Sequence, residues 1–295
     1  MRKDNTAFTL IELLVVVTII VVLLALLTPA LDTAIEQANI AVCGSHLKGI
    51  GQASVTYALE NKKVFIICRN RLIQNIFSPL GQQQDDATAD DAKVDWLAAL
   101  ASVGLAESEV SDVGNGQQNV LWFGQQVPVN TGVKEMQHGI TKIWNCPSRN
   151  FKSGWDPQYR QMVVAYQYFG GMRHWHNAAG TFNARSPVSL ATSSGGWALT
   201  ADMILRAHQR WDDDNGYPQF YGDPVAHRAA DGYRPAGGNV GYVDGSVVWS
   251  PFDDMVYIHV TGSDQLNFGQ FWRQNDLGDY GPVVPDAAEG RNIKD

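Results

Sequence analysis

The chain has 295 residues, a formal net charge of −8 and three cysteines. This length is enough for a long helix plus one extracytoplasmic domain, or for two small domains. The acidic balance and the absence of any Lys/Arg-rich run argue against a nucleic-acid partner, because phosphate binding needs clustered cations.

An apolar segment follows a short polar leader and runs from Phe8 to Thr28. At about 1.5 Å per residue it spans roughly 31 Å, the thickness of one bilayer core. It contains a carboxylate, Glu12, and an ionisable group in such a segment is costly and usually functional. The interpretations are a plain single-pass anchor, a secretory signal peptide, or a leader cut ahead of the apolar run. Neither of the first two gains anything from Glu12.

The residues around Glu12 help to decide among these three interpretations of the apolar segment. Residues 8–13 read FTLIEL and resemble the type IV prepilin signal at every position. The resemblance implies that a prepilin peptidase cleaves between Ala7 and Phe8 and methylates the amine of Phe8, with Ala7 in place of the family's usual glycine. The Phe8 amine is cationic near neutral pH. Pairing it with Glu12 of a neighbouring subunit would offset two charges that are costly in lipid and would set the axial register.

Beyond Pro29, where the family often has a helix-bending proline, apolar residues recur at three- to five-residue steps, which predicts an amphipathic helix. We therefore expect a helix kink at Pro29 and an α+β fold, with a long N-terminal helix packed on an antiparallel β-rich domain as in pilins. The expected parts are a leader (1–7), a transmembrane or filament-core helix (8–29), its amphipathic continuation (30–60), a periplasmic β-rich globular domain (61–276) and a mobile tail (277–295).

The second half of the chain is rich in glycine and aromatic residues, which favours short strands joined by loops. An Asp-Gly pair between alternating apolar residues predicts a β-hairpin with a two-residue turn at Asp244–Gly245. After Val260 the chain lacks periodicity, which predicts a loop. The other expected elements are a helix over Val94–Val103, strands over Val120–Phe123, Val127–Val129, Val163–Phe169 and Trp197–Leu205, and a strand at Trp144–Cys146 that ends in a turn at Pro147.

Three further stretches resemble one large prepilin-like group: a Cys-x-x-x-Leu-Lys-x-x-Gly stretch at residues 43–51, a Cys-Pro-Ser segment at 146–148, and a His-x9-Asp-Gly signature. The signature residues would be His227, Asp244 and Gly245, although sixteen residues rather than nine separate His227 from Asp244; an insertion at Ala229–Arg234 would explain the gap. The resemblance implies a pseudopilin-like or minor-pilin-like subunit, akin to the major pseudopilin of type II secretion.

The three cysteines would face an oxidising compartment. Because Cys43 and Cys146 both fall in group-typical segments, they are the preferred disulfide, which leaves Cys68 free. Sequence alone does not fix the pairing, and three reduced core cysteines are an open alternative.

Two other stretches are candidate metal ligands. Asp212, Asp213 and Asp214 lie in an oxygen-rich loop with a turn-forming glycine, the kind of loop that binds Ca²⁺, although the full EF-hand spacing is missing. His174 and His176 would point to one side of a strand, but a transition-metal site needs a third ligand. The sequence contains none of the common catalytic motifs, so we do not expect an enzyme.

The expected location is the bacterial inner membrane, crossed once, with the C-terminal domain in the periplasm because Arg2 and Lys3 should stay cytoplasmic. The expected partners are the prepilin peptidase, other pilin or pseudopilin subunits, an inner-membrane assembly platform and the lipid bilayer. The alternatives are a membrane-tethered module that binds carbohydrate or protein, with an aromatic binding face, and an anchored hydrolase.

Overall fold

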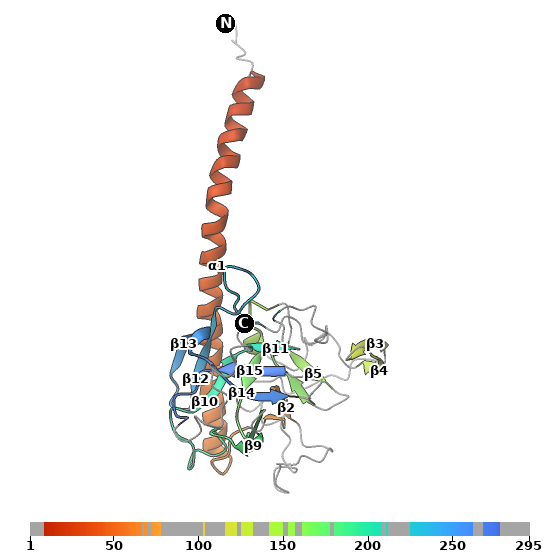
Figure 1. Ribbon diagram of the computed structural model, residues 1–295, viewed down its shortest axis with the longest axis vertical. Coiled ribbons are helices and arrows are strands. Elements are labelled where there is room, and N and C mark those ends of the chain that lie inside the picture. Colours follow the sequence, from red (N-terminus) through yellow and green to blue (C-terminus); the bar gives the residue numbers. More distant parts are fainter. Residues whose placement is uncertain are drawn as a thin grey trace. The chain divides into compact units, whose positions relative to one another are not determined.

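The computed structural model, drawn in Figure 1, describes residues 9–66, 68–69, 72–77, 103, 116–122, 125–131, 142–149, 153–156, 161–177, 180–207, 211, 225–261 and 268–277. Two compact units make up the chain, Met1–Asn39 and Ile40–Asp295. A long helix and a set of antiparallel sheets are the principal elements, so the predicted α+β class is confirmed.

Helix α1 (Leu10–Glu60) is a single helix of 51 residues, coloured red to orange in Figure 1. Pro29 lies inside it and, lacking an N–H, leaves the carbonyl of Ala25 without its usual helical partner. Beside it, the hydroxyl of Thr28 donates a hydrogen bond of 2.8 Å to the carbonyl of Leu24. The helix therefore continues through Pro29, and a kink there stays a prediction.

Within the second unit, α1 buries one face against the domain. Five of the buried positions recur at alternating steps of four and three residues, the period of an amphipathic helix: Cys43, Leu47, Ile50, Ser54 and Tyr57, with Gly51 and Ala58 buried next to them. The apolar face that the sequence predicts beyond Pro29 is thus the face of α1 that packs against the domain.

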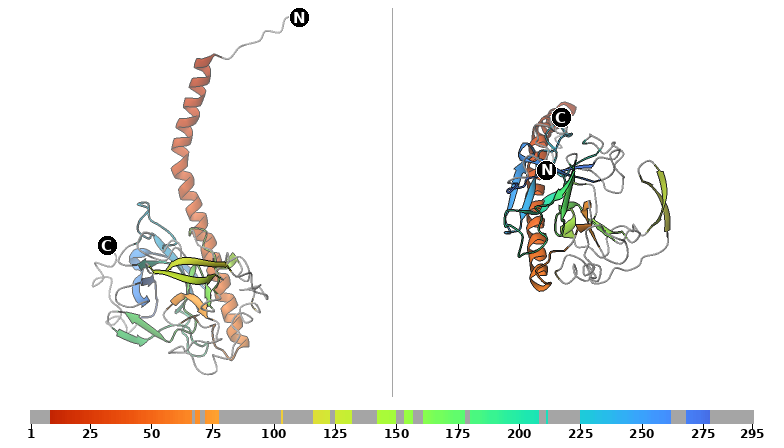
Figure 2. Two further views of the ribbon diagram at one scale, coloured as in Figure 1. Left: turned by 90° about the vertical axis from the view of Figure 1, so that its right-hand side faces the viewer. Right: turned by 60° about the horizontal axis from the view of Figure 1, so that its bottom comes forward.

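The second half of α1 contacts a four-stranded sheet with the strand order β13-β12-β10-β7. Neighbouring strands in this sheet are antiparallel. The strands are β7 (Tyr166–Tyr168), β10 (Ala198–Asp202), β12 (Gly237–Tyr242) and β13 (Val247–Pro251). Strands β12 and β13 lie beside the second half of α1 in Figure 1 and in the right-hand view of Figure 2. The side chain of Asn239 on β12 donates a hydrogen bond of 3.0 Å to the backbone carbonyl of Ile40. Helix and sheet are thereby joined by a polar contact. His46 on α1 makes a second one, with its Nδ1 3.0 Å from the hydroxyl oxygen of Tyr166 on β7.

Among the described residues, the other strands form two further sheets and two hairpins. A three-stranded sheet has the order β11-β15-β14, and a four-stranded sheet has the order β1-β2-β6-β5. The elements are β11 (Leu205–Ala207), β14 (Val256–Thr261), β15 (Phe268–Trp272), β1 (Cys68–Arg69), β2 (Leu72–Phe77), β5 (Gly154–Asp156), β6 (Gln161–Val163), the pairs β3 (Gly116–Trp122) with β4 (Gln125–Thr131) and β8 (His174–Asn177) with β9 (Gly180–Asn183), and the 3₁₀ turns η2 (Lys142–Trp144) and η4 (Phe252–Asp254).

Aromatic side chains fill the core. Trp144, Trp175, Trp211 and Trp272 are each at most 1% exposed. Trp272 packs against both Phe169 and Trp175, with ring centroids 4.5 and 5.9 Å apart. These four tryptophans therefore contribute to stability through burial and ring packing and do not form an exposed carbohydrate-binding face.

Several predicted elements are confirmed. The strands predicted at Val120–Phe123 and Val127–Val129 fall in β3 and β4, with Phe123 itself outside the described residues, and the Asp244–Gly245 hairpin is formed by β12 and β13. The two-residue turn is wrong, because Tyr242 and Ser246 are joined by a backbone hydrogen bond and enclose three residues. Gly245 adopts a φ of +84°, as a three-residue hairpin with a left-handed last residue requires.

Other predictions are corrected. The strand expected at Trp144–Cys146 is absent: Trp144 is the last residue of the 3₁₀ turn η2, and Asn145 and Cys146 follow it without regular structure. The loop expected after Val260 contains β15, which pairs with both β11 and β14. The predicted strands Val163–Phe169 and Trp197–Leu205 are each broken once, between β6 and β7 and between β10 and β11. The helix expected over Val94–Val103 lies outside the described residues, apart from Val103, and so does nearly all of the tail at 277–295.

Gly237 is the position in β12 where a side chain fits least. Its φ is +152°, and a Cβ there would collide with the backbone oxygen of Ser250 on β13. We expect Gly237→Ala to lower the free energy of unfolding by roughly 2–4 kcal/mol, because backbone strain and overpacking each cost about 1–3 kcal/mol. Urea unfolding of the detergent-solubilised chain measures this, with Gly232→Ala as the control.

Gly232 also has a positive φ, +72°, but a Cβ at that position meets nothing within 4 Å. Its replacement should cost only the conformational strain of about 1–2 kcal/mol. Equal losses from the two variants would contradict the close approach of β12 and β13 at Gly237.

Candidate functional site

The start of α1 is organised by Thr9 and Glu12. The Glu12 carboxylate accepts hydrogen bonds on Oε2 from the backbone N–H of Thr9 at 2.8 Å and from the Thr9 hydroxyl at 2.7 Å. In return, the Glu12 N–H donates to the Thr9 hydroxyl oxygen at 3.3 Å. This reciprocal pattern is a capping box, which satisfies N–H groups that the first helical turn leaves without partners. Glu12 therefore has a structural role within its own subunit.

The capping box leaves part of the carboxylate available. Both of its described side-chain bonds end on Oε2, so Oε1 can accept from another donor, and the residue is exposed. Ala7 and Phe8, the predicted cleavage site, lie outside the described residues. The Thr-x-x-Glu spacing of residues 9–12 is the signal that could have identified the cap from the sequence.

The following residues of α1 form an apolar surface with no polar face. Leu10 is 80% exposed and Leu26 is 73% exposed. The helix has an 18-residue window of mean hydropathy 3.3 whose residues are not buried in the protein, so by length and composition it can cross a membrane. Such a surface needs lipid or other apolar helices to cover it.

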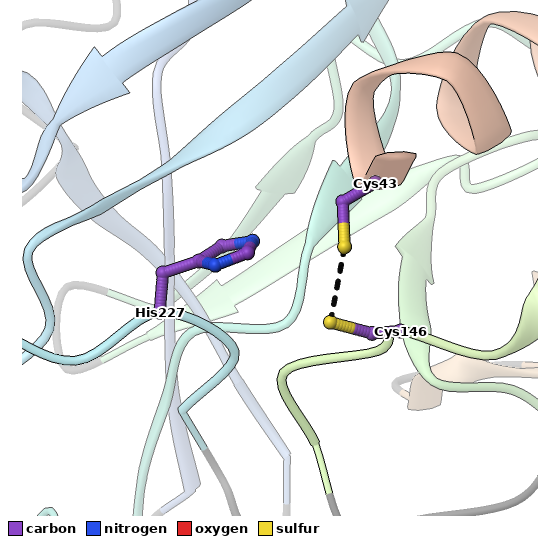
Figure 3. Close-up of side chains that lie close together, drawn as sticks. All are labelled: Cys43, Cys146 and His227. Carbon is purple, nitrogen blue, oxygen red and sulfur yellow. Dashed lines mark hydrogen bonds between the residues drawn. The ribbon is translucent and has the colours of Figure 1, made fainter. Parts of the chain in front are cut away.

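A second cluster of functional groups is buried in the other unit. Cys43 on α1 and Cys146, which follows η2, bring their sulfur atoms to 3.1 Å as free thiols. The fully buried imidazole of His227 faces the two sulfurs, as Figure 3 shows. One ligand atom from each of these three residues lies within 4.8 Å of the other two.

Asp202 on β10 adjoins this cluster. Its Oδ2 lies 3.2 Å from Nε2 of His227 and accepts hydrogen bonds from the backbone N–H and the side-chain amide of Asn239 at 2.6 and 2.9 Å. Its other oxygen, Oδ1, is buried without a hydrogen-bond partner within the described part of the chain. Asn239 also binds Ile40, so one polar network extends from β10 through β12 to α1.

The two thiols differ in acidity. The hydrogen bond from Cys43 lowers the pKa of Cys146, and the same contact, together with burial, raises the pKa of Cys43. The pair therefore loses its first proton more easily than its second. Nearby, burial raises the pKa of Tyr166, which keeps its hydroxyl protonated and donating to the carbonyl of Asn145 at 3.2 Å.

Comparison with protein families gives one match, over residues 2–28, to the model described as the prokaryotic N-terminal methylation motif. The chain carries a prepilin-type methylation motif. Comparisons with curated proteins and with solved structures gave no match. The prepilin-type motif supports the type IV pilin-like superfamily and indicates a membrane-anchored, single-pass structural subunit that is a substrate of a prepilin peptidase.

In this prepilin-like chain, the residues of the predicted His-x9-Asp-Gly signature differ in how deeply they are buried. His227 is fully buried, whereas Asp244 is exposed in the hairpin turn and binds Ser246 through its Oδ1. The suggested insertion Ala229–Arg234 is an exposed loop, closed at its base by a bridge between Arg228 and Pro235. The His-x9-Asp-Gly subgroup itself stays a prediction.

The structure brings Cys43 and Cys146 together, while their disulfide stays a prediction. The side chains of Cys68 and His176 and the candidate calcium ligands Asp212, Asp213 and Asp214 lie outside the described residues. The sequence did not associate His227 and Asp202 with the two cysteines. These residues come from separate segments, and no spacing pattern links them.

Proposed function

We propose that this chain is a pseudopilin-like or minor-pilin-like structural subunit that is cleaved between Ala7 and Phe8, methylated on Phe8 and assembled into a periplasmic pseudopilus or related filament of the type II secretion kind. The observation that carries the proposal is the prepilin-type motif over residues 2–28. The partners would be the prepilin peptidase, other pilin-like subunits and an inner-membrane assembly platform.

The apolar part of α1 supports an assembly role. Before assembly, lipid would cover its exposed leucine and valine side chains, and in a filament neighbouring helices would replace the lipid. Helix association of this kind is driven by packing and by polar contacts in an apolar medium. A surface that is apolar on every side, as here, suits a helix surrounded by several copies of itself.

Glu12 would supply the polar contact. Removal of residues 1–7 creates an amine on Phe8, and this amine can bind the free Oε1 of Glu12 on the next subunit while Oε2 keeps its bonds to Thr9. The intramolecular cap and the intermolecular ion pair would then coexist on one carboxylate. Because an unpaired charge in lipid is costly, subunits shifted along the axis would be disfavoured.

The test is intact mass and N-terminal sequencing of the membrane-extracted protein from its native host. The expected mature chain begins at N-methylated Phe8. Ala7→Gly should be processed at least as completely, since the family usually has glycine there, whereas a bulky residue in Ala7→Leu should block cleavage. A wild-type chain that still begins at Met1, or one that begins near Leu31 after removal of a signal peptide, would contradict the proposal.

A further inference from the structure

The buried cluster of two thiols and an imidazole has the composition of a metal site. We propose that Cys43, Cys146 and His227 bind one divalent transition-metal ion of the zinc class, with the carboxylate of Asp202 beside it. Three segments separated in sequence contribute the ligands: the second half of α1, the turn after η2 and the segment ahead of β12 (Figure 3).

The donor set selects the class of metal. Thiolate sulfur and imidazole nitrogen are the usual ligands of Zn²⁺, whereas Ca²⁺ and Mg²⁺ prefer oxygen. The three ligand atoms already lie within 4.8 Å of one another. Two zinc-bound sulfurs at about 2.3 Å from a tetrahedral metal lie roughly 3.8 Å apart. The present separation of 3.1 Å must therefore widen by about 0.7 Å, a movement within reach of side-chain rotation.

The surroundings supply an independent reason for a cation. Asp202 is 1% exposed, and its Oδ1 is buried without a hydrogen-bond partner among the described residues. Burying an anionic oxygen is costly unless something compensates its charge. A divalent cation held by the two thiolates and the imidazole would supply this compensating positive charge.

Asp202 also fits the role of a positioning residue. Carboxylates commonly hold metal-binding imidazoles in orientation, and Oδ2 of Asp202 lies 3.2 Å from Nε2 of His227. With Nε2 donating to this carboxylate, Nδ1 would be the nitrogen that binds the metal. Asn239 fixes that carboxylate through two hydrogen bonds and binds Ile40 on α1. The metal and this network would thus join α1 to the sheet at neighbouring points.

A metal ion and a Cys43–Cys146 disulfide exclude each other, because the disulfide consumes both thiolates. The experiment uses the full-length chain, extracted in detergent under anaerobic conditions with a thiol-blocking control. Zinc is measured per chain by elemental analysis, and the apo protein is titrated with Co²⁺ while its absorption is recorded. The expected results are about one zinc per chain and Co²⁺ spectra with sulfur-to-metal charge-transfer bands typical of thiolate ligands in a four-coordinate site.

Variants assign the ligands. Cys43→Ser, Cys146→Ser and His227→Ala should each lose the metal, and Cys68→Ser is the matched control that should keep it. Asp202→Asn should weaken metal affinity about 10- to 100-fold with the thiolate bands retained, as changes to such positioning groups do. The Co²⁺ spectrum of the wild-type chain reports thiolate ligation even if a ligand variant fails to fold.

Three outcomes would overturn the proposal: a Cys43–Cys146 disulfide in the anaerobically extracted protein, reduced wild-type protein that gives no charge-transfer bands with Co²⁺, or metal binding that survives in Cys43→Ser but is lost in Cys68→Ser.

Discussion

Glu12→Ala is expected to abolish incorporation of the subunit into filaments while leaving its insertion into the membrane intact or improved. A charged residue within an apolar helix costs on the order of 2.5–3.5 kcal/mol on insertion scales, and less near the helix end, so its removal cannot harm insertion. Assembly would lose the partner of the Phe8 amine. Sheared filaments and membranes, compared by immunoblot with wild type, measure the two effects separately.

Two matched variants separate the charge of Glu12 from its capping role. Glu12→Gln keeps an acceptor for the Thr9 N–H, since glutamine also completes a capping box, but it cannot form the ion pair. Thr9→Ala removes the cap residue, at a cost of about 1 kcal/mol, and keeps the carboxylate. We expect Glu12→Gln to fail in assembly as Glu12→Ala does, and Thr9→Ala to assemble at a reduced level. If Glu12→Gln assembled normally, the carboxylate would matter only as a helix cap.

The extent of α1 and the pairing of β12 with β13 could be predicted because local sequence determines them. Apolar periodicity identifies the helix, and an Asp-Gly pair between alternating apolar residues identifies the hairpin. The strand β15 was missed for the opposite reason. Gly269 and Gln270 interrupt any apolar alternation there. The strand is stabilised by its two neighbours, β14, which precedes it in the chain, and β11, which lies about sixty residues earlier.

The buried site likewise depends on contacts between segments that are separated in sequence. The family resemblance predicted that Cys43 and Cys146 lie close together, but it did not predict that His227 and Asp202 lie beside them. Those contacts depend on the order of β10 and β12 in the sheet, which no local pattern in the sequence specifies. In contrast, the capping box of Thr9 and Glu12 is a local motif, and it could have been identified from the spacing of the two residues.

Asp202→Ala is expected to destabilise the domain by roughly 3–5 kcal/mol, the loss typical of removing one partner from a buried charged network. The variant leaves the backbone N–H of Asn239 without the acceptor it has at 2.6 Å. A buried donor that loses its acceptor costs about 1–3 kcal/mol. Asp202→Ala also removes the carboxylate beside His227. The side-chain amide of Asn239 loses one of its two hydrogen bonds and keeps the other, to the carbonyl of Ile40 on α1.

The measurement is urea unfolding of the detergent-solubilised chain, followed by the fluorescence of its buried tryptophans and carried out with a metal chelator, so that only the protein network contributes. Asp202→Asn is the matched control, because its carbonyl can still accept from the Asn239 N–H while the charge is lost. Its destabilisation should be clearly smaller than that of Asp202→Ala. If both variants unfolded at the wild-type urea concentration, Asp202 would not support the contact between the sheet and α1, and the domain would depend on apolar packing alone at this point.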